Sequence, residues 1–212
     1  MSDTESRRSF PGHADIAVAM RPEFAGGADW LLGYFENEIR KGVVFGADQT
    51  VQIGWSIVLL KPSADGTLEL FEQRLGAMPI AWARGANGTY RQLMLQNEIC
   101  RRMGVEPDYP SMLQSGVVSP NFFACGGKFE MSRDPPQGNG SGWVFREAGY
   151  AGSEGRLCSL FEIASAVPQV LMLLPLPAAA SAASDGRGVK MSCGAKTLSS
   201  DNDDFLKSLF AP

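Results

Sequence analysis

The segment from Gly116 to Glu147 constrains the fold more than any other part of this 212-residue chain. Its sequence, GVVSPNFFACGGKFEMSRDPPQGNGSGWVFRE, places strand-like pieces on both sides of a loop rich in glycine and proline. Alternation of period two is typical of strands, and glycine and proline break regular structure at defined points. We therefore predict strands at 116–119, 128–133 and 142–146, with a rigid loop at 134–141.

The half of the chain before this segment predicts helices and strands in turn. Polar residues, prolines and glycines fill residues 1–28, and we expect a mobile N-terminal segment there. Asp29 resembles a helix N-cap, and apolar residues at helical spacing follow it as far as Lys41. The later predicted elements are a strand at 50–60, a strand at 67–72 that forms a hairpin with it, a short strand at 78–82 and a helix at 89–103.

The C-terminal part contains a capping box and a stretch of small residues. Ser159 and Glu162 have the capping-box spacing, which predicts a short helix from Leu160 until Pro168. Residues 175–188, PLPAAASAASDGRG, are expected to form a linker or an exposed loop. Asp201 is the expected cap of a final short helix.

These elements predict an α+β fold of antiparallel sheets with a few packed helices. The connection around Tyr109 suggests a soft boundary between two small subdomains. The predicted organisation is a mobile segment at 1–28, an α+β subdomain at 29–110, a second α+β subdomain at 111–176, and a linker with a C-terminal tail at 177–212.

Composition restricts the class of protein. The net charge of −4 argues against a dedicated nucleic-acid binder and mildly favours a basic partner. The four cysteines have no C-x-x-C spacing and no nearby histidine, which indicates reduced thiols and a cytoplasmic protein. We find no secretory signal, and the most apolar run, 167–176, contains two prolines and is too short to span a membrane.

Residues with catalytic potential are few. The single histidine, His13, lies in the segment expected to be mobile, so a histidine-activated nucleophile or a two-histidine metal site is not expected. Gly126-Gly127-Lys128 lacks the spacing of a phosphate loop, and Gly138, Gly140 and Gly142 lack that of a dinucleotide-binding turn. We therefore predict no catalytic residue, no cofactor and no metal.

The loop at 134–141 and its flanks remain the candidate binding surface. Prolines stiffen this loop, and arginine and tryptophan contribute strongly to protein interfaces when they are held rigidly. The alternative is that Trp143 is a core residue of its strand and Arg133 pairs with Asp134 or Glu147. The candidate partner-binding residues are Arg133, Asp134, Ser141, Trp143, Arg146 and Glu147.

Four pieces of this segment carry a resemblance to a known family. The strand GVVSP, the glycine-lysine turn, the strand end SRDPP and the strand SGWVF are together similar to family thirty-three of the bacterial polymorphic-toxin immunity proteins, formerly a domain of unknown function. The similarity extends over residues 29–177. The chain departs from the family pattern at Phe129-Glu130-Met131 and at Ala148-Gly149-Tyr150, where members have a tyrosine and an acidic cluster.

The resemblance implies a cytoplasmic immunity protein, monomeric or homodimeric, that binds and neutralises a cognate toxin delivered by a system such as type VI secretion. Such a protein needs a rigid complementary surface and no catalytic group. Two alternatives stay open. One is a small hydrolase or transferase that uses Glu130, Asp134 or Glu147 in a cleft, and the other is an adaptor or chaperone of a secretion system.

Overall fold

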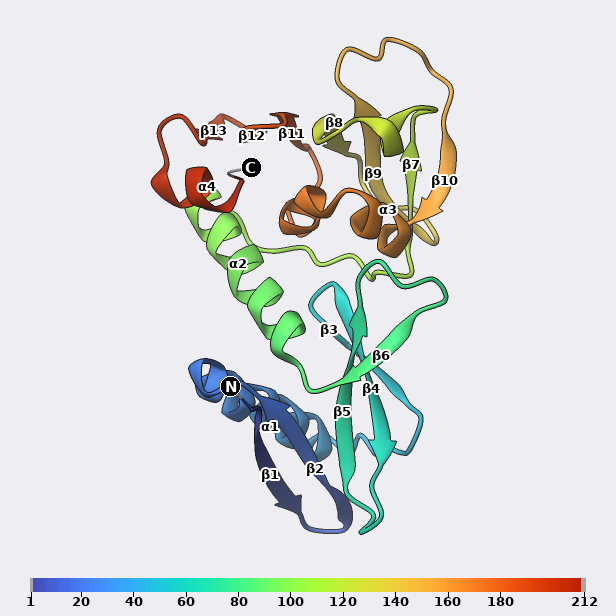
Figure 1. Ribbon diagram of the computed structural model, residues 1–212, viewed down its shortest axis with the longest axis vertical. Coiled ribbons are helices and arrows are strands. Elements are labelled where there is room, and N and C mark those ends of the chain that lie inside the picture. The colour runs from blue at the N-terminus through green and yellow to red at the C-terminus, as the bar shows by residue number, and fades with distance from the viewer. Residues whose placement is uncertain (1, 211–212) are drawn as a thin grey trace. The chain divides into compact units, whose positions relative to one another are not determined.

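The computed structural model describes residues 2–210 and divides into two compact units, residues 1–93 and 94–212. The architecture is α+β, as the sequence predicts, with two mixed and mostly antiparallel sheets of six and seven strands (Figure 1). The division falls inside the long helix α2 (Asn87–Met103), whereas the sequence suggests a boundary near residue 110.

Unit 1, residues 1–93, has a six-stranded sheet and one long helix of its own. Its elements are β1 (Thr4–Phe10), β2 (His13–Met20), η1 (Pro22–Phe24), α1 (Ala25–Arg40), β3 (Thr50–Ile53), β4 (Ser56–Pro62), β5 (Leu68–Arg74), β6 (Ala81–Arg84) and the start of α2. Five strands follow the order β1-β2-β5-β4-β3, and β6 pairs with β5. The predicted hairpin is confirmed as β4 and β5, which pair antiparallel.

The N-terminal segment is a hairpin of β1 and β2, not the mobile segment that the sequence suggested. Residues 16–20 of β2 are all buried, with exposed fractions of at most 4%. A short continuous apolar run is typical of a strand that is covered on both faces, and IAVAM is such a run. The polar residues that suggested mobility lie mainly on the outer strand, β1, where Arg7 forms ion pairs with Asp15 and Asp65.

His13 has a structural position in this unit and is not a solvated tail residue. Its Nε2 accepts a hydrogen bond from the Phe45 amide (2.9 Å), and its Nδ1 lies 2.7 Å from the Ala14 carbonyl oxygen. The rings of Phe10 and Phe45 approach the imidazole edge-on. The Nε2 contact therefore holds the loop before β3 against the first hairpin, while the Nδ1 contact stays within the hairpin.

Two other predicted boundaries in unit 1 are wrong. The single strand expected at 50–60 is two strands, because Gly54 has a positive φ of 61° and makes the two-residue turn between Ile53 and Ser56. Helix α1 begins at Ala25, directly after η1, and so Asp29 lies inside the helix and does not cap it.

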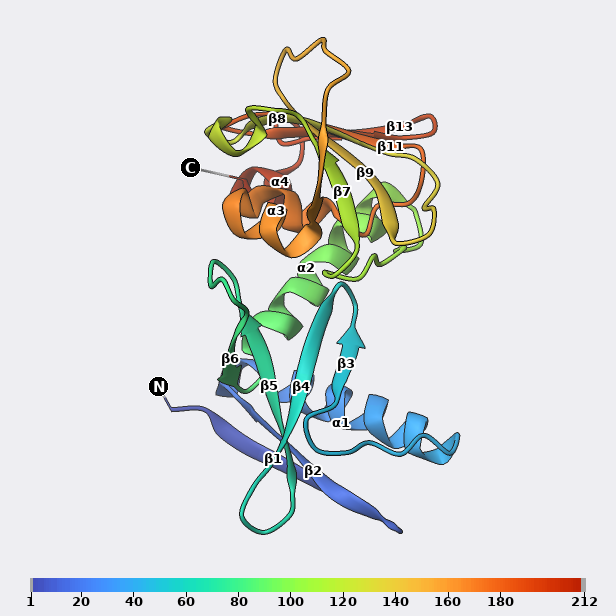
Figure 2. The ribbon, with the colours of Figure 1, turned by 90° about the vertical axis from the view of Figure 1, so that its right-hand side faces the viewer.

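Unit 2, residues 94–212, has a seven-stranded sheet with helices on one side. Its elements after α2 are β7 (Ser115–Val118), η2 (Phe122–Ala124), β8 (Lys128–Arg133), β9 (Gly140–Glu147), β10 (Arg156–Ser159), α3 (Leu160–Ala166), η3 (Pro168–Leu173), β11 (Ala180–Asp185), β12 (Val189–Cys193), β13 (Lys196–Ser199) and α4 (Asp204–Leu209). The strand order is β10-β7-β9-β8-β11-β12-β13, and only β7 and β9 among these neighbours are parallel. Figure 2 shows the sheet as one layer, with α3 and α4 on the same side of it.

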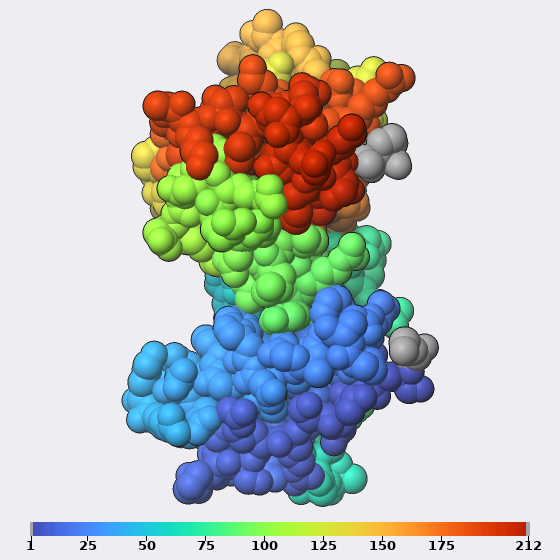
Figure 3. Space-filling model, turned by 90° about the vertical axis from the view of Figure 1, so that its left-hand side faces the viewer, coloured from blue at the N-terminus to red at the C-terminus, as the bar shows by residue number. Residues whose placement is uncertain are grey.

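The capping box is confirmed, because the Ser159 hydroxyl accepts a hydrogen bond from the Glu162 amide at the start of α3. The final helix is capped by Asp203 and not by Asp201. Asp203 also pairs with Arg102 (2.7 Å), whose guanidinium lies over the Phe205 ring. These contacts attach α4 to the C-terminal half of α2, and Figure 3 shows the two segments, red and green, in contact.

The segment expected to be a linker contains a central strand of the sheet. β11 pairs antiparallel with β8 on one side and with β12 on the other. Its sequence, ASAASD, has low intrinsic strand preference, and the small residues suggested a loop. Tertiary pairing overrides that preference here, since both edges of the segment are hydrogen-bonded.

Candidate functional site

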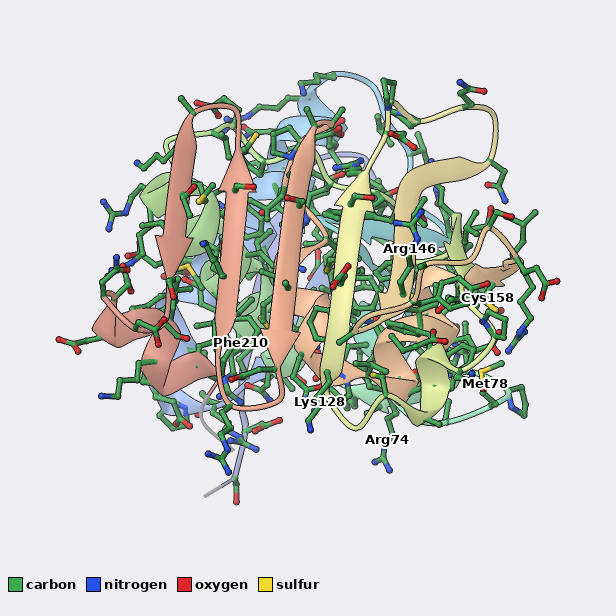
Figure 4. The ribbon with its side chains drawn as sticks, turned by 90° about the horizontal axis from the view of Figure 1, so that it is seen from above. Arg74, Met78, Lys128, Arg146, Cys158 and Phe210 are labelled. Atoms are coloured by element: carbon green, nitrogen blue, oxygen red, sulfur yellow. The ribbon has the colours of Figure 1, made fainter. Side chains whose placement is uncertain are left out.

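One face of the seven-stranded sheet is left without a helical cover, and we call it the open face. Side chains in β8 alternate, so that Phe129 and Met131 are buried on the inner face while Lys128 and Glu130 are exposed. The same alternation in β12 buries Met191 and exposes Lys190. Figure 4 looks onto this face, and no helix lies in front of β8, β11, β12 or β13.

Strand register arranges the open face in rows that run across the sheet. One row crosses all seven strands and consists of small, β-branched or hydroxyl side chains, with Leu157 at its apolar end. Its members are Leu157, Val117, Val144, Ser132, Ser181, Ser192 and Thr197. The neighbouring row carries the charges, and its members are Arg146, Glu130, Ala183, Lys190 and Ser199.

Two adjoining depressions hollow this face over β8, β11 and β12. Their volumes are about 670 and 490 Å³, and they share Glu130, Ala183 and Lys190 as lining residues. The floor is low because the short side chain of Ala183 lies between the long charged side chains of Glu130 and Lys190. The result is a shallow, open trough and not an enclosed pocket.

Two carboxylates of the trough accept hydrogen bonds from neighbouring residues, whereas its cations take part in none of the ion pairs found within residues 2–210. Asp185 accepts hydrogen bonds from the amides of Arg187 (2.8 Å) and Gly188 (2.9 Å), which lower the pKa of its carboxyl group. Asp201 accepts a hydrogen bond from the Ser199 hydroxyl. The ion pairs among residues 2–210 include none of the cations of the trough, which are Lys128, Arg146, Arg187 and Lys190.

Three of the six residues predicted to bind a partner lie in the interior. The exposed fractions of Arg133, Trp143 and Ser141 are 3%, 1% and 0%. The Arg133 guanidinium donates to the carbonyls of Ser141 (3.1 Å), Asp108 (2.7 Å) and Leu176 (2.7 Å), and it lies over the Trp143 ring. Burial of this kind excludes direct contact with a partner, so the prediction for these three residues is corrected.

The serine-glycine-tryptophan strand also has an internal role. Gly142 has a φ of 82°, and a Cβ there would lie 1.9 Å from the Asp134 carbonyl oxygen. The Trp143 indole donates a hydrogen bond to the Leu174 carbonyl (2.9 Å). Gly142 and Trp143 therefore have structural roles. Gly142 lets the backbone pass close to Asp134, and Trp143 links β9 to the segment that contains Leu174.

The other three predicted residues remain at the surface, but they do not share one place. Asp134 is exposed where β8 ends. Arg146 belongs to the open face, while Glu147 turns toward the opposite face and accepts a hydrogen bond from the Ser119 hydroxyl, which lowers its pKa. Only Arg146 of the six thus lies in the trough.

The carboxylates named for a hydrolase do not converge. Glu130 is opposite Arg146 on the open face, and Glu147 is opposite Phe129 on the inner face, so the two carboxylates point to different sides of the sheet.

Burial raises the pKa of the Cys100 thiol to about 12, and it also raises that of Cys158, which keeps both protonated near neutral pH. Within residues 2–210 no group of three metal-binding side chains occurs.

Sequence reasoning missed Ala183 and Lys190 as members of the site. Lys190 follows the segment that was expected to be a linker, although the alternation in Val189-Lys190-Met191 is a strand signal. Ala183 carries no chemical signal of its own, and only the pairing of β11 with both neighbours places it at the floor of the trough.

Comparison with protein families, curated proteins and solved structures gave no match for this chain. Among the described residues, no helix has the length and apolar character needed to cross a bilayer.

Proposed function

We propose that this chain acts by binding another protein through the open face, as an immunity protein that neutralises a cognate toxin. The observation that carries the proposal is the trough, where cations that form no ion pair within residues 2–210 lie around a floor of small side chains. A broad, shallow and mixed-polarity surface suits a protein partner better than a small substrate, which would be bound in a deeper and more apolar pocket.

The positions of the ionisable groups also support a binding role over a catalytic one. Glu130 and Glu147 lie on opposite faces of the sheet, so these two carboxylates cannot act together as acid and base on one substrate. The immunity role itself comes from the resemblance in the segment 116–147, where a toxin would be the partner.

The test is co-expression of the chain with the product of the adjacent gene. We expect a stable complex on size-exclusion chromatography, and we expect cells that express the neighbouring protein to grow only when the chain is present. A complex whose partner stays active would favour an adaptor or chaperone, and the absence of any complex would contradict the proposal.

A further inference from the structure

We propose that the trough binds an acidic segment of the partner protein, an inference that rests on the proposed function and names the chemistry of the partner. The whole chain is acidic, with a net charge of −4, and this suggested a basic partner. The side chains of the trough favour the opposite conclusion, because short-range contacts depend on local groups when salt screens the distant ones.

The cations of the trough outnumber its carboxylates: Lys128, Arg146, Arg187 and Lys190 line it together with Glu130, Asp185 and Asp201. Asp185 and Asp201 already receive hydrogen bonds from their own turns. Arg146, Lys190 and Lys128 form no ion pair among the described residues, and Glu130 is the single carboxylate of the trough for which no hydrogen bond is found within residues 2–210. A partner carboxylate would therefore gain charge-assisted hydrogen bonds at several points.

The spacing of the cations sets the length of the segment. Arg146 and Lys190 stand in one row with two strands between them. Neighbouring strands are about 4.8 Å apart, so the two backbones are about 14 Å apart. Two carboxylates eight residues apart on a helix are separated by about 12 Å, a span that the long cationic side chains can reach.

Small side chains let such a helix approach closely. Between the two cations the row has Glu130, which lies opposite Arg146, and then Ala183. The next row has the hydroxyls of Ser132 and Ser181. The inner face of the sheet is already covered by helices, and a partner helix on the open face would complete a three-layer arrangement. The exposed Leu157, 69% accessible, would receive an apolar residue at one end of the segment.

The experiment is an NMR titration of the full chain with a polyglutamate peptide of about 12 residues, long enough to span the roughly 14 Å between the strands of Arg146 and Lys190. We expect amide shifts centred on Glu130, Ala183 and Lys190, which weaken as salt is added. The double reversal Arg146→Glu with Lys190→Glu should weaken binding on the order of tenfold or more. The matched control, Arg74→Glu with Arg91→Glu, makes the same change in net charge on exposed residues outside the trough and should leave binding unchanged.

A second variant tests the floor without changing charge. Ala183→Trp should fill the trough and abolish binding while circular dichroism shows a folded chain. The proposal is overturned if polylysine of equal length shifts the same amides, if oligothymidylate binds as tightly, if polyglutamate gives no shift, or if light scattering shows a dimer that the double reversal dissociates. If the adjacent gene product binds the double reversal as well as it binds the original chain, this inference falls, whereas the immunity role stands with its binding surface outside the trough.

Discussion

Arg133 shows at the residue scale how burial changes the meaning of a side chain. Its sequence context, a charged residue before two prolines, is typical of an exposed loop. In the structure its buried guanidinium donates hydrogen bonds to three carbonyls and forms an ion pair with the Asp108 carboxylate. Arginine can fill this position because its planar group directs several donors in fixed directions.

We predict that Arg133→Met destabilises the chain by about 3–5 kcal/mol, because it removes the donors from the buried hydrogen bonds to the Ser141 and Leu176 carbonyls. The free energy of unfolding in urea, measured by tryptophan fluorescence, checks this. The control is Arg146→Met on the open face, which should change stability by less than about 0.5 kcal/mol. Equal effects of the two substitutions would contradict the assignment of Arg133 to the core.

Strand β11 decides the architecture of unit 2 at the scale of the element. Its consecutive residues Ala182 and Ala183 point to opposite faces, and Ala182 packs between Met131 and Met191 with an exposed fraction of 5%. Small residues suit this strand because, on its inner side, Ala182 lies between the buried side chains of Met131 and Met191, while Ala183 on its outer side forms the floor of the trough.

We predict that Ala182→Leu destabilises the fold by about 1–3 kcal/mol, because the inner face has no room for the added carbons. Ala183→Leu, one residue further on the open face, should be nearly neutral. Urea midpoints for the two variants, measured side by side, test the register of β11. A large effect at Ala183 with none at Ala182 would mean that the strand faces the other way.

An ion-pair cluster near the end of α2 makes the stability of the fold depend on pH. Arg101 and Arg102 lower the pKa of Glu98 from 4.5 to about 2. A folded pKa below the unfolded value means that this stabilisation is present above about pH 4.5 and is lost as the pH falls through about 2.

We expect Glu98→Gln to reduce stability at pH 7 and to have a smaller effect as the pH approaches 2. The difference at neutral pH should stay below about 1 kcal/mol, since salt and solvent screen a partly exposed pair. Unfolding measured at several pH values provides the comparison. Glu154→Gln, on an exposed loop residue outside the ion pairs of the described chain, should show no such trend.

At the scale of the whole molecule, each unit has its own core. Phe35 of unit 1 and Phe129 of unit 2 are both fully buried. Domains with separate cores can open separately, and their local stability is reported by amide hydrogen exchange.

We predict that Phe35→Ala, at a cost of about 3–5 kcal/mol, accelerates exchange in residues 1–93 and leaves most of 104–210 protected. Phe129→Ala should do the reverse. Mass spectrometry of peptide fragments after exchange makes the measurement. Acceleration throughout the chain in either variant would mean that the two units unfold as one cooperative body.

Elements with strong local signals could be located from the amino-acid sequence alone. Strand β8 matches its prediction at both ends, and α3 begins at its predicted cap, because side-chain alternation and capping chemistry act over a few residues. The α+β class follows from the same signals.

Which of these residues lie next to one another depends on long-range contacts. β11 is a strand because two neighbours pair with it, Arg133 is buried because three distant carbonyls surround it, and Lys190 joins Arg146 through the register of the strands between them. Each of these facts depends on contacts between segments that are far apart in the chain, and local propensity does not contain that information.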